Sequence, residues 1–194
     1  MHNETSEELG DTCWTCLYKE IASRHAGDVG VALFNYYDAI NWHFFDNKLP
    51  QAFLLTALTA YGACIGLTEP DPHKLPTILI HPTLKTEEDR FYTVLHEATH
   101  VYVRYVLGVT SYGSKTSHSN PAWIAEVNRL AKLLGYTNIE IGFNKVTREK
   151  KEDGGKIKRA QTGSVPYSCS YSFPHTLEKE TGQPLPPIEQ WLKD

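Results

Sequence analysis

The stretch HEATH, residues 96–100, has two histidines four positions apart and a glutamate directly after the first. On an α-helix each residue advances by about 100°, so His96 and His100 would lie about 40° apart on one face. Two imidazoles in that arrangement can bind one tetrahedral zinc ion, and Glu97 is placed to reach a water molecule at the metal. The spacing therefore predicts a metal-binding helix with an acid–base residue beside the metal.

A catalytic zinc site needs a third protein ligand and an open position for water. The residues after His100, VYVRYVLG, lack the third histidine of the compact HExxHxxGxxH motif. Two candidates follow: His118, after a polar loop, and Glu126, inside the next predicted helix. Spacing alone leaves both open as the third ligand.

The setting of the two histidines on their helix is also informative. The apolar side chains of this helix cluster on one side of the helical wheel, and both histidines fall almost opposite the centre of that cluster. This pattern argues against histidines that are simply buried in a core. The remaining alternative to a metal site is a solvent-exposed face that carries the histidines by chance.

Helical periodicity and capping residues predict the elements that must position the motif. Helices are expected over 13–25, 29–45, 86–107 and 121–134. Thr86 and Asn120 are expected as N-caps, and Gly135 as the stop of the last helix. The HEATH motif thus falls in the middle of a long helix.

Short apolar runs bounded by turn residues predict strands over 52–58, 61–67 and 77–82, the first two as a hairpin. Beyond Gly135, the segments 139–146 and 156–165 are expected to form a β-ribbon around the turn EDGG. The proline-rich end, 182–194, is expected to lie extended over the surface. The fold class that follows is α+β.

Composition bounds the possible functions. Of the 194 residues 41% are hydrophobic and 22% charged, which indicates a globular chain, and the net charge of −4 gives no general attraction to nucleic acid or anionic membrane. There is no apolar run of the roughly 18 residues that a membrane span needs, and the polar N-terminus does not resemble a secretory signal. A cytoplasmic location without membrane contact is therefore expected. Four cysteines do not suggest a disulfide framework, and the CxxC of Cys13 and Cys16 stands alone.

Several motifs occur in the order typical of one known family. They are LFNYYDAINWHFFDNKLP, AYGACIGL, TILIHPTL, VLHEATHVYV and SHSNPAWIAEVNRLAKLLG, which together span about Leu33 to Leu134. This set resembles the SprT-like zinc metallopeptidase domain of the Spartan-type DNA–protein crosslink proteases. The HExxH motif is shared by many peptidases, so the ordered set carries the resemblance.

The resemblance implies that His96, His100 and His118 are zinc ligands and that Glu97 is the general base acting on a zinc-bound water. It implies a zincin-like fold, with a small three-stranded sheet packed on helices, in a domain over 1–135, and a C-terminal extension over 136–194. The implied function is a zinc-dependent endopeptidase that hydrolyses peptide bonds of flexible or unfolded proteins, with DNA-associated proteins among the candidates. Tyr112, Tyr171 and His175 are candidates for an additional oxyanion donor, and the alternative for each is a surface or packing role.

The chain also departs from the family. Only Cys169 follows Gly135, so the four-cysteine zinc ribbon of many members cannot form. The locally basic segment 145–159 could bind DNA phosphates or could be a solvated ribbon tip. The alternative function is a non-catalytic, zinc-containing adaptor that binds DNA or protein; the presence of Glu97 argues against it, because an adaptor needs no general base.

Overall fold

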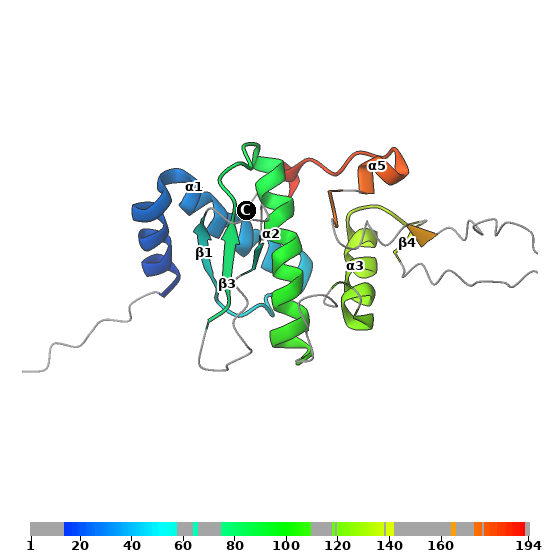
Figure 1. The fold of residues 1–194 in the computed structure, drawn as a ribbon, viewed down its shortest axis with the longest axis horizontal. Coiled ribbons are helices and arrows are strands. Elements are labelled where there is room, and N and C mark those ends of the chain that lie inside the picture. Colours follow the sequence, from blue (N-terminus) through cyan, green and yellow to red (C-terminus); the bar gives the residue numbers. More distant parts are fainter. Residues whose placement is uncertain are drawn as a thin grey trace, which may run out of the picture.

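The computed structural model of the protein describes residues 14–57, 64–65, 75–109, 118, 120–137, 139–141, 164–165, 173–175 and 177–192. Helices and a small sheet combine in an α+β arrangement, as the sequence predicts. The helix α2 (Glu87–Val101) runs through the middle of the molecule, with the sheet on one side and α3 (Pro121–Leu133) on the other (Figure 1). None of the helices in these described ranges is long and apolar enough to cross a bilayer.

The first helix, α1 (Trp14–Phe45), joins the two predicted N-terminal helices and is kinked at Gly27. Gly27 has a φ of +58°, a backbone conformation that residues with a Cβ rarely adopt, so this glycine permits the kink. Beyond the kink, the predicted apolar stripe is buried at Leu33, Phe34, Tyr37, Ile40, Phe44 and Phe45. As a whole, α1 packs against α2 and against β1.

The sheet has the order β1-β3-β2, with β1 at Phe53–Thr56, β2 at Cys64–Ile65 and β3 at Thr77–Ile80. β1 runs parallel to β3, with Leu54 opposite Ile78, and β2 runs antiparallel to β3. The predicted hairpin between the first two strands is therefore wrong. The expectation rested on their short separation along the chain, whereas β3 takes the central place, where both of its edges are hydrogen-bonded and Ile78 and Ile80 are buried.

The predicted caps of the two site-bearing helices are confirmed. The Thr86 hydroxyl accepts a hydrogen bond from the Asp89 N–H at 3.0 Å, and the Asn120 side chain accepts one from the Ala122 N–H at 2.8 Å. α2 then continues directly into a π-helix, Tyr102–Val106, in which the Leu107 N–H bonds to the Tyr102 carbonyl at 3.0 Å. The helix has the predicted extent, but its last turn is wider than an α-helical turn.

The end of the chain packs into the same core as α2. β4 (Glu140–Ile141) pairs with β5 (Ser164–Val165) in parallel, which corrects the expected ribbon around a tight turn. A short helix, α5 (Leu177–Thr181), and a 3-10 turn, Ile188–Gln190, follow.

Three side chains of this last part, Phe173, Leu177 and Ile188, are fully buried in the core. The Tyr92 hydroxyl of α2 also donates a hydrogen bond to the Pro186 carbonyl. The end of the chain, 182–194, was expected to lie extended over the surface, and most of its described residues are exposed. The buried side chain of Ile188 anchors this segment to the core.

Candidate metal centre

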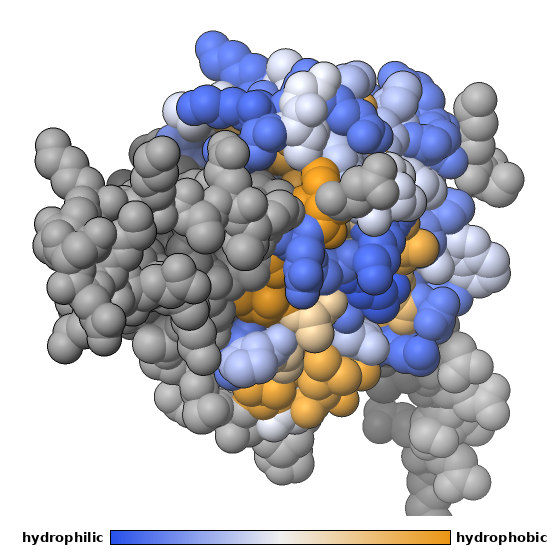
Figure 2. All heavy atoms as spheres, turned by 90° about the vertical axis from the view of Figure 1, so that its right-hand side faces the viewer, coloured by the Kyte–Doolittle hydropathy of each residue, from blue (hydrophilic) through white to orange (hydrophobic). Residues whose placement is uncertain are grey.

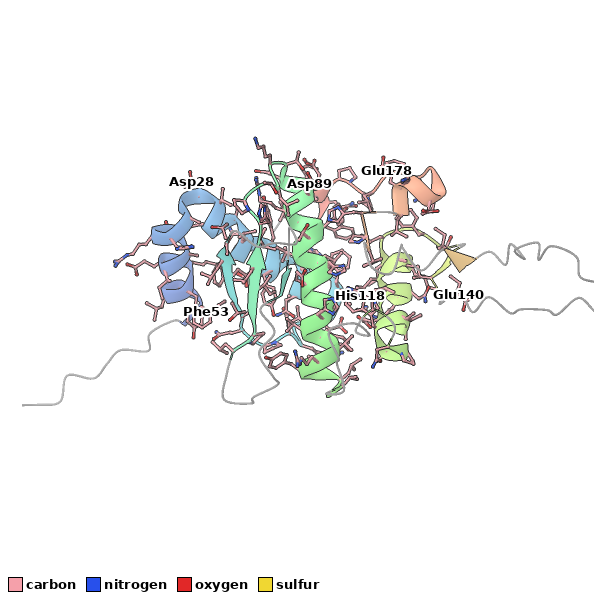
Figure 3. The ribbon with its side chains drawn as sticks, in the orientation of Figure 1. Asp28, Phe53, Asp89, His118, Glu140 and Glu178 are labelled. Carbon is pink, nitrogen blue, oxygen red and sulfur yellow. The ribbon has the colours of Figure 1, made fainter. Side chains whose placement is uncertain are left out.

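Three histidines from two separate segments meet at the side of α2. His96 and His100 lie one turn apart on α2, and His118, just before α3, lies beside α2 on the side that faces α3 (Figure 3). The Nε2 atom of His118 lies 3.1 Å from Nε2 of His96 and 3.0 Å from Nε2 of His100. The structure thus brings together the three residues that the sequence analysis expected as ligands.

The separations of these nitrogens suit a single metal ion. A tetrahedral zinc ion with Zn–N bonds of about 2.0–2.1 Å would hold its ligand nitrogens about 3.3 Å apart. The ligand atoms offered by the three histidines all lie within 4.8 Å of one another, and two of the pairs are close to that spacing. The group could therefore bind a metal ion.

The side chain of Trp123, in the first turn of α3, contacts the rings of all three histidines. Its ring stacks on the His100 ring, with centroids 3.9 Å apart and planes 18° apart. The rings of His96 and His118 approach the same indole at 5.1 and 5.0 Å. Sequence reasoning placed Trp123 in the apolar stripe of its helix and missed this role, because no spacing rule links it to HEATH.

A backbone carbonyl fixes the orientation of His96. Nδ1 of His96 lies 2.6 Å from the carbonyl oxygen of Phe173. Since a carbonyl can only accept a hydrogen bond, Nδ1 carries the hydrogen, and the lone pair of Nε2 points to the other two histidines. Such a partner commonly orients metal-binding histidines. Every residue has a backbone carbonyl, so the sequence alone could not identify Phe173 as the partner of His96.

Burial keeps the three imidazoles neutral. It lowers the pKa of His96 to about 3 and that of His118 to about 4. The pKa of His100 is also lowered well below its ordinary value, mainly by burial and by the other two histidines, with a smaller contribution from the charge of Arg104. Neutral imidazoles are the form that binds a metal ion.

The Glu97 side chain lies in the same buried environment. It is 5% exposed, and its Oε2 atom has no hydrogen-bond partner among the residues described. Burial raises the pKa of Glu97 to about 8, and no neighbouring cation offsets that rise. A carboxyl group of this kind is a stronger base than a solvated one and is suited to proton transfer.

This burial also settles the alternative of a chance histidine face in solvent. His100 and Glu97 are each only 5% exposed. The side of α2 opposite its apolar stripe is covered by Trp123 and by the segment around Phe173. The alternative of a solvent-exposed face is therefore wrong, because α3 and the C-terminal part cover this side of α2.

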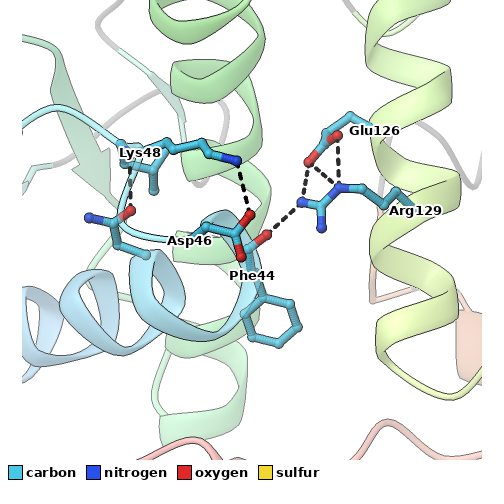
Figure 4. A network of polar contacts seen from close by, with 7 residues as sticks. Phe44, Asp46, Lys48, Glu126 and Arg129 are labelled. Carbon is cyan, nitrogen blue, oxygen red and sulfur yellow. Dashed lines mark hydrogen bonds and ion pairs between the residues drawn. The ribbon is translucent and has the colours of Figure 1, made fainter.

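Glu126, the other candidate third ligand, has a different partner. Its carboxylate accepts hydrogen bonds from the Arg129 guanidinium at 2.5 and 3.1 Å, and Arg129 also donates to the Phe44 carbonyl at 2.5 Å (Figure 4). Glu126 is buried and lies outside the group of three histidines. This network attaches α3 to the end of α1, so Glu126 has a structural role.

His175 lies near the histidine cluster. Its Nε2 atom is 3.1 Å from the hydroxyl oxygen of Thr93, a residue three positions before His96 on α2. The remaining expectations fall outside the described residues: Tyr112 and Tyr171 as oxyanion donors, the basic segment 145–159, and the cysteines Cys13 and Cys169.

The surface around α3 has no uniform character. Figure 2 shows the molecule from this side, with hydrophilic side chains next to an apolar patch.

A comparison of the chain with models of known protein families, with curated proteins and with solved structures finds no match. The site itself must therefore support any functional conclusion.

Proposed function

We propose that the protein is a zinc-dependent endopeptidase of the SprT-like, zincin type, which hydrolyses peptide bonds in flexible or unfolded proteins. The convergence of His96, His100 and His118 beside the buried carboxyl of Glu97 carries this proposal. Three neutral nitrogen ligands with no carboxylate favour zinc over magnesium or calcium. The ordered motifs described above support the same conclusion.

When bound, zinc supplies a Lewis acid that acidifies water and polarises a carbonyl group. The chain supplies the rest of the chemistry. Glu97 takes the proton from the attacking water and later delivers it to the leaving amine. A dication beside Glu97 would lower the raised pKa of its carboxyl group, since an opposite charge favours the carboxylate form, which makes Glu97 a base near neutral pH.

The sheet supports an extended substrate. Within the described sheet, β1 and β2 each pair on one side only, with β3 between them. An unpaired edge of this kind can add the backbone of a peptide as a further strand. Such binding needs a substrate segment without its own secondary structure, which is why flexible or unfolded proteins, including DNA-associated ones, are the proposed substrates.

The test is degradation of denatured casein by the zinc-loaded chain, with metal content measured on the same samples. We expect cleavage that stops on chelation and returns when zinc is added. Glu97→Gln should retain zinc and lose at least about 10²-fold in rate, the usual contribution of a general base. Zinc binding without cleavage by the wild type would overturn the proposal and favour the adaptor function. Absence of zinc would overturn both.

A further inference from the structure

Arg104 is a buried cation one turn after His100. It lies in the π-helix Tyr102–Val106, which continues α2 beyond the metal-site residues. The residue is only 6% exposed. Wide helical turns of this kind occur frequently at functional sites, where they redirect a side chain.

Arg104 forms no ion pair within the described part of the chain. Its Nε atom is buried without a hydrogen-bond partner there. Neither of the two buried acids among the described residues pairs with Arg104. Glu126 pairs with Arg129, and the raised pKa of Glu97 is caused by burial, with no contribution from a neighbouring cation. The other described ion pairs all join residues distant from α2 in the sequence.

A buried arginine without a partner is costly to a folded protein. An unpaired charge loses its hydration and gains nothing in return, so nearly all buried charges are paired. Proteins retain such groups where a ligand completes them. Arginine is suited to this role because its planar guanidinium binds a carboxylate through two parallel hydrogen bonds.

We propose that Arg104 binds a carboxylate group of the substrate next to the metal centre. The inference rests on the proposed peptidase function and makes it more specific, because the enzyme would prefer peptides with a carboxylate near the cleaved bond. The carboxylate could belong to an acidic side chain or to the C-terminus of the peptide. A nucleic acid phosphate fits less well, since polyanions are bound by rows of exposed cations and this chain has a net charge of −4.

The experiment measures equilibrium binding of labelled peptides by fluorescence anisotropy, with and without zinc, in the Glu97→Gln background to prevent turnover. One peptide pair differs only by Glu or Gln next to the central bond, and a second pair only by a free or amidated C-terminus. Binding is compared for Arg104, Arg104→Lys and Arg104→Met. The matched control is Arg24→Met, because the Arg24 side chain is 79% exposed.

We expect the unaltered Arg104 to favour the carboxylate form of one pair by about tenfold, as a charge-assisted hydrogen bond implies. That ratio should fall to about 1 in Arg104→Met, remain partly in Arg104→Lys and be unchanged in Arg24→Met. The affected pair identifies the source of the carboxylate. Equal ratios in all variants overturn the inference, as does an oligonucleotide that displaces the peptide only when Arg104 is present.

Thermal unfolding of the ligand-free variants separates binding from a structural role. Met keeps the length of the apolar stem and removes the unpaired charge, so Arg104→Met should unfold at the same or a higher temperature. A midpoint lowered by several degrees would assign Arg104 to the fold and overturn the inference. Carboxylate-selective binding without cleavage in the wild type would refute the peptidase function alone, whereas cleavage without selectivity would refute only the role of Arg104.

Discussion

The ring of Trp123 stacks on the ring of His100 with their centroids 3.9 Å apart, so the first turn of α3 packs directly against the candidate site on α2. The indole is fully buried and also contacts the rings of His96 and His118. One side chain of α3 therefore contacts all three ligand candidates. The candidate metal site and the packing of α2 against α3 therefore share this contact.

Replacing Trp123 with Ala should weaken both properties. Loss of the buried ring is expected to lower the free energy of unfolding by about 3–5 kcal/mol and to reduce metal affinity, while Trp123→Phe should retain most of each. The measurements are chemical unfolding and competition for zinc against a chelating dye. Trp42→Ala is the control: its side chain is 65% exposed, and its effect should stay within about 0.5 kcal/mol.

Each of the three histidines should be needed for the metal. His96→Ala, His100→Ala and His118→Ala should each lose the single zinc ion expected per chain, because two protein ligands bind zinc far more weakly than three. Metal content after dialysis, measured by mass spectrometry, tests this expectation. His25→Ala, which changes an exposed histidine, should keep its zinc. Retention of full zinc by His118→Ala would remove His118 from the ligand set.

Metal retention should persist to unusually low pH. Protons compete with a metal ion only below the pKa of the imidazole, and burial lowers the pKa of His96 to about 3 and of His118 to about 4. We expect zinc to remain bound until pH falls to about 4, whereas histidines with an ordinary pKa near 6.5 would release it at a higher pH. Metal loss near pH 6.5 from a chain that is still folded by circular dichroism would contradict the buried site.

The same pKa shifts determine whether the free energy of unfolding rises or falls with pH. As pH falls below about 6.5, the unfolded chain binds protons on these histidines and the folded chain does not, so acidification favours unfolding. Glu97 acts in the opposite direction. Burial raises its folded pKa to about 8, so its contribution is full below the unfolded value near 4.5 and is lost as pH rises through 8. The unfolding midpoints of metal-free wild type and Glu97→Gln should therefore diverge as pH rises from about 4.5 to about 8, with the variant more stable at the upper end of that range.

Glu126 should matter for stability and not for the metal. Arg129→Ala leaves the Glu126 carboxylate buried without its partner, and we expect a loss of about 1–3 kcal/mol in unfolding free energy. Glu126→Gln should still bind one zinc ion. The control Arg24→Ala breaks an exposed ion pair with Glu20 and should cost less than about 1 kcal/mol. Loss of zinc in Glu126→Gln would reopen Glu126 as a ligand.

Local patterns predicted the local parts of this protein. The caps Thr86 and Asn120, the extent of the HEATH helix and the shared face of its histidines follow from helix geometry, and all are present. The strand pairing was predicted wrongly, because separation along the chain does not decide which strand lies in the centre of a sheet.

The residues that surround the candidate site could not be predicted from the spacing of residues in the sequence. Trp123 and the Phe173 carbonyl reach the histidines only through tertiary packing, and a backbone acceptor leaves no trace in residue type. Burial of Glu97 likewise depends on which element covers α2. These contacts nonetheless decide whether the motif is a neutral, oriented ligand set or an exposed face.

The hydrogen bond from His96 to Phe173 spans 77 positions of the sequence. During synthesis on the ribosome, the HEATH helix emerges long before the carbonyl that orients its first histidine. A nascent chain that has not reached Phe173 holds the motif without the oriented ligand. The hydrogen bond that orients the first of the three candidate ligands can therefore form only after this late segment has been translated.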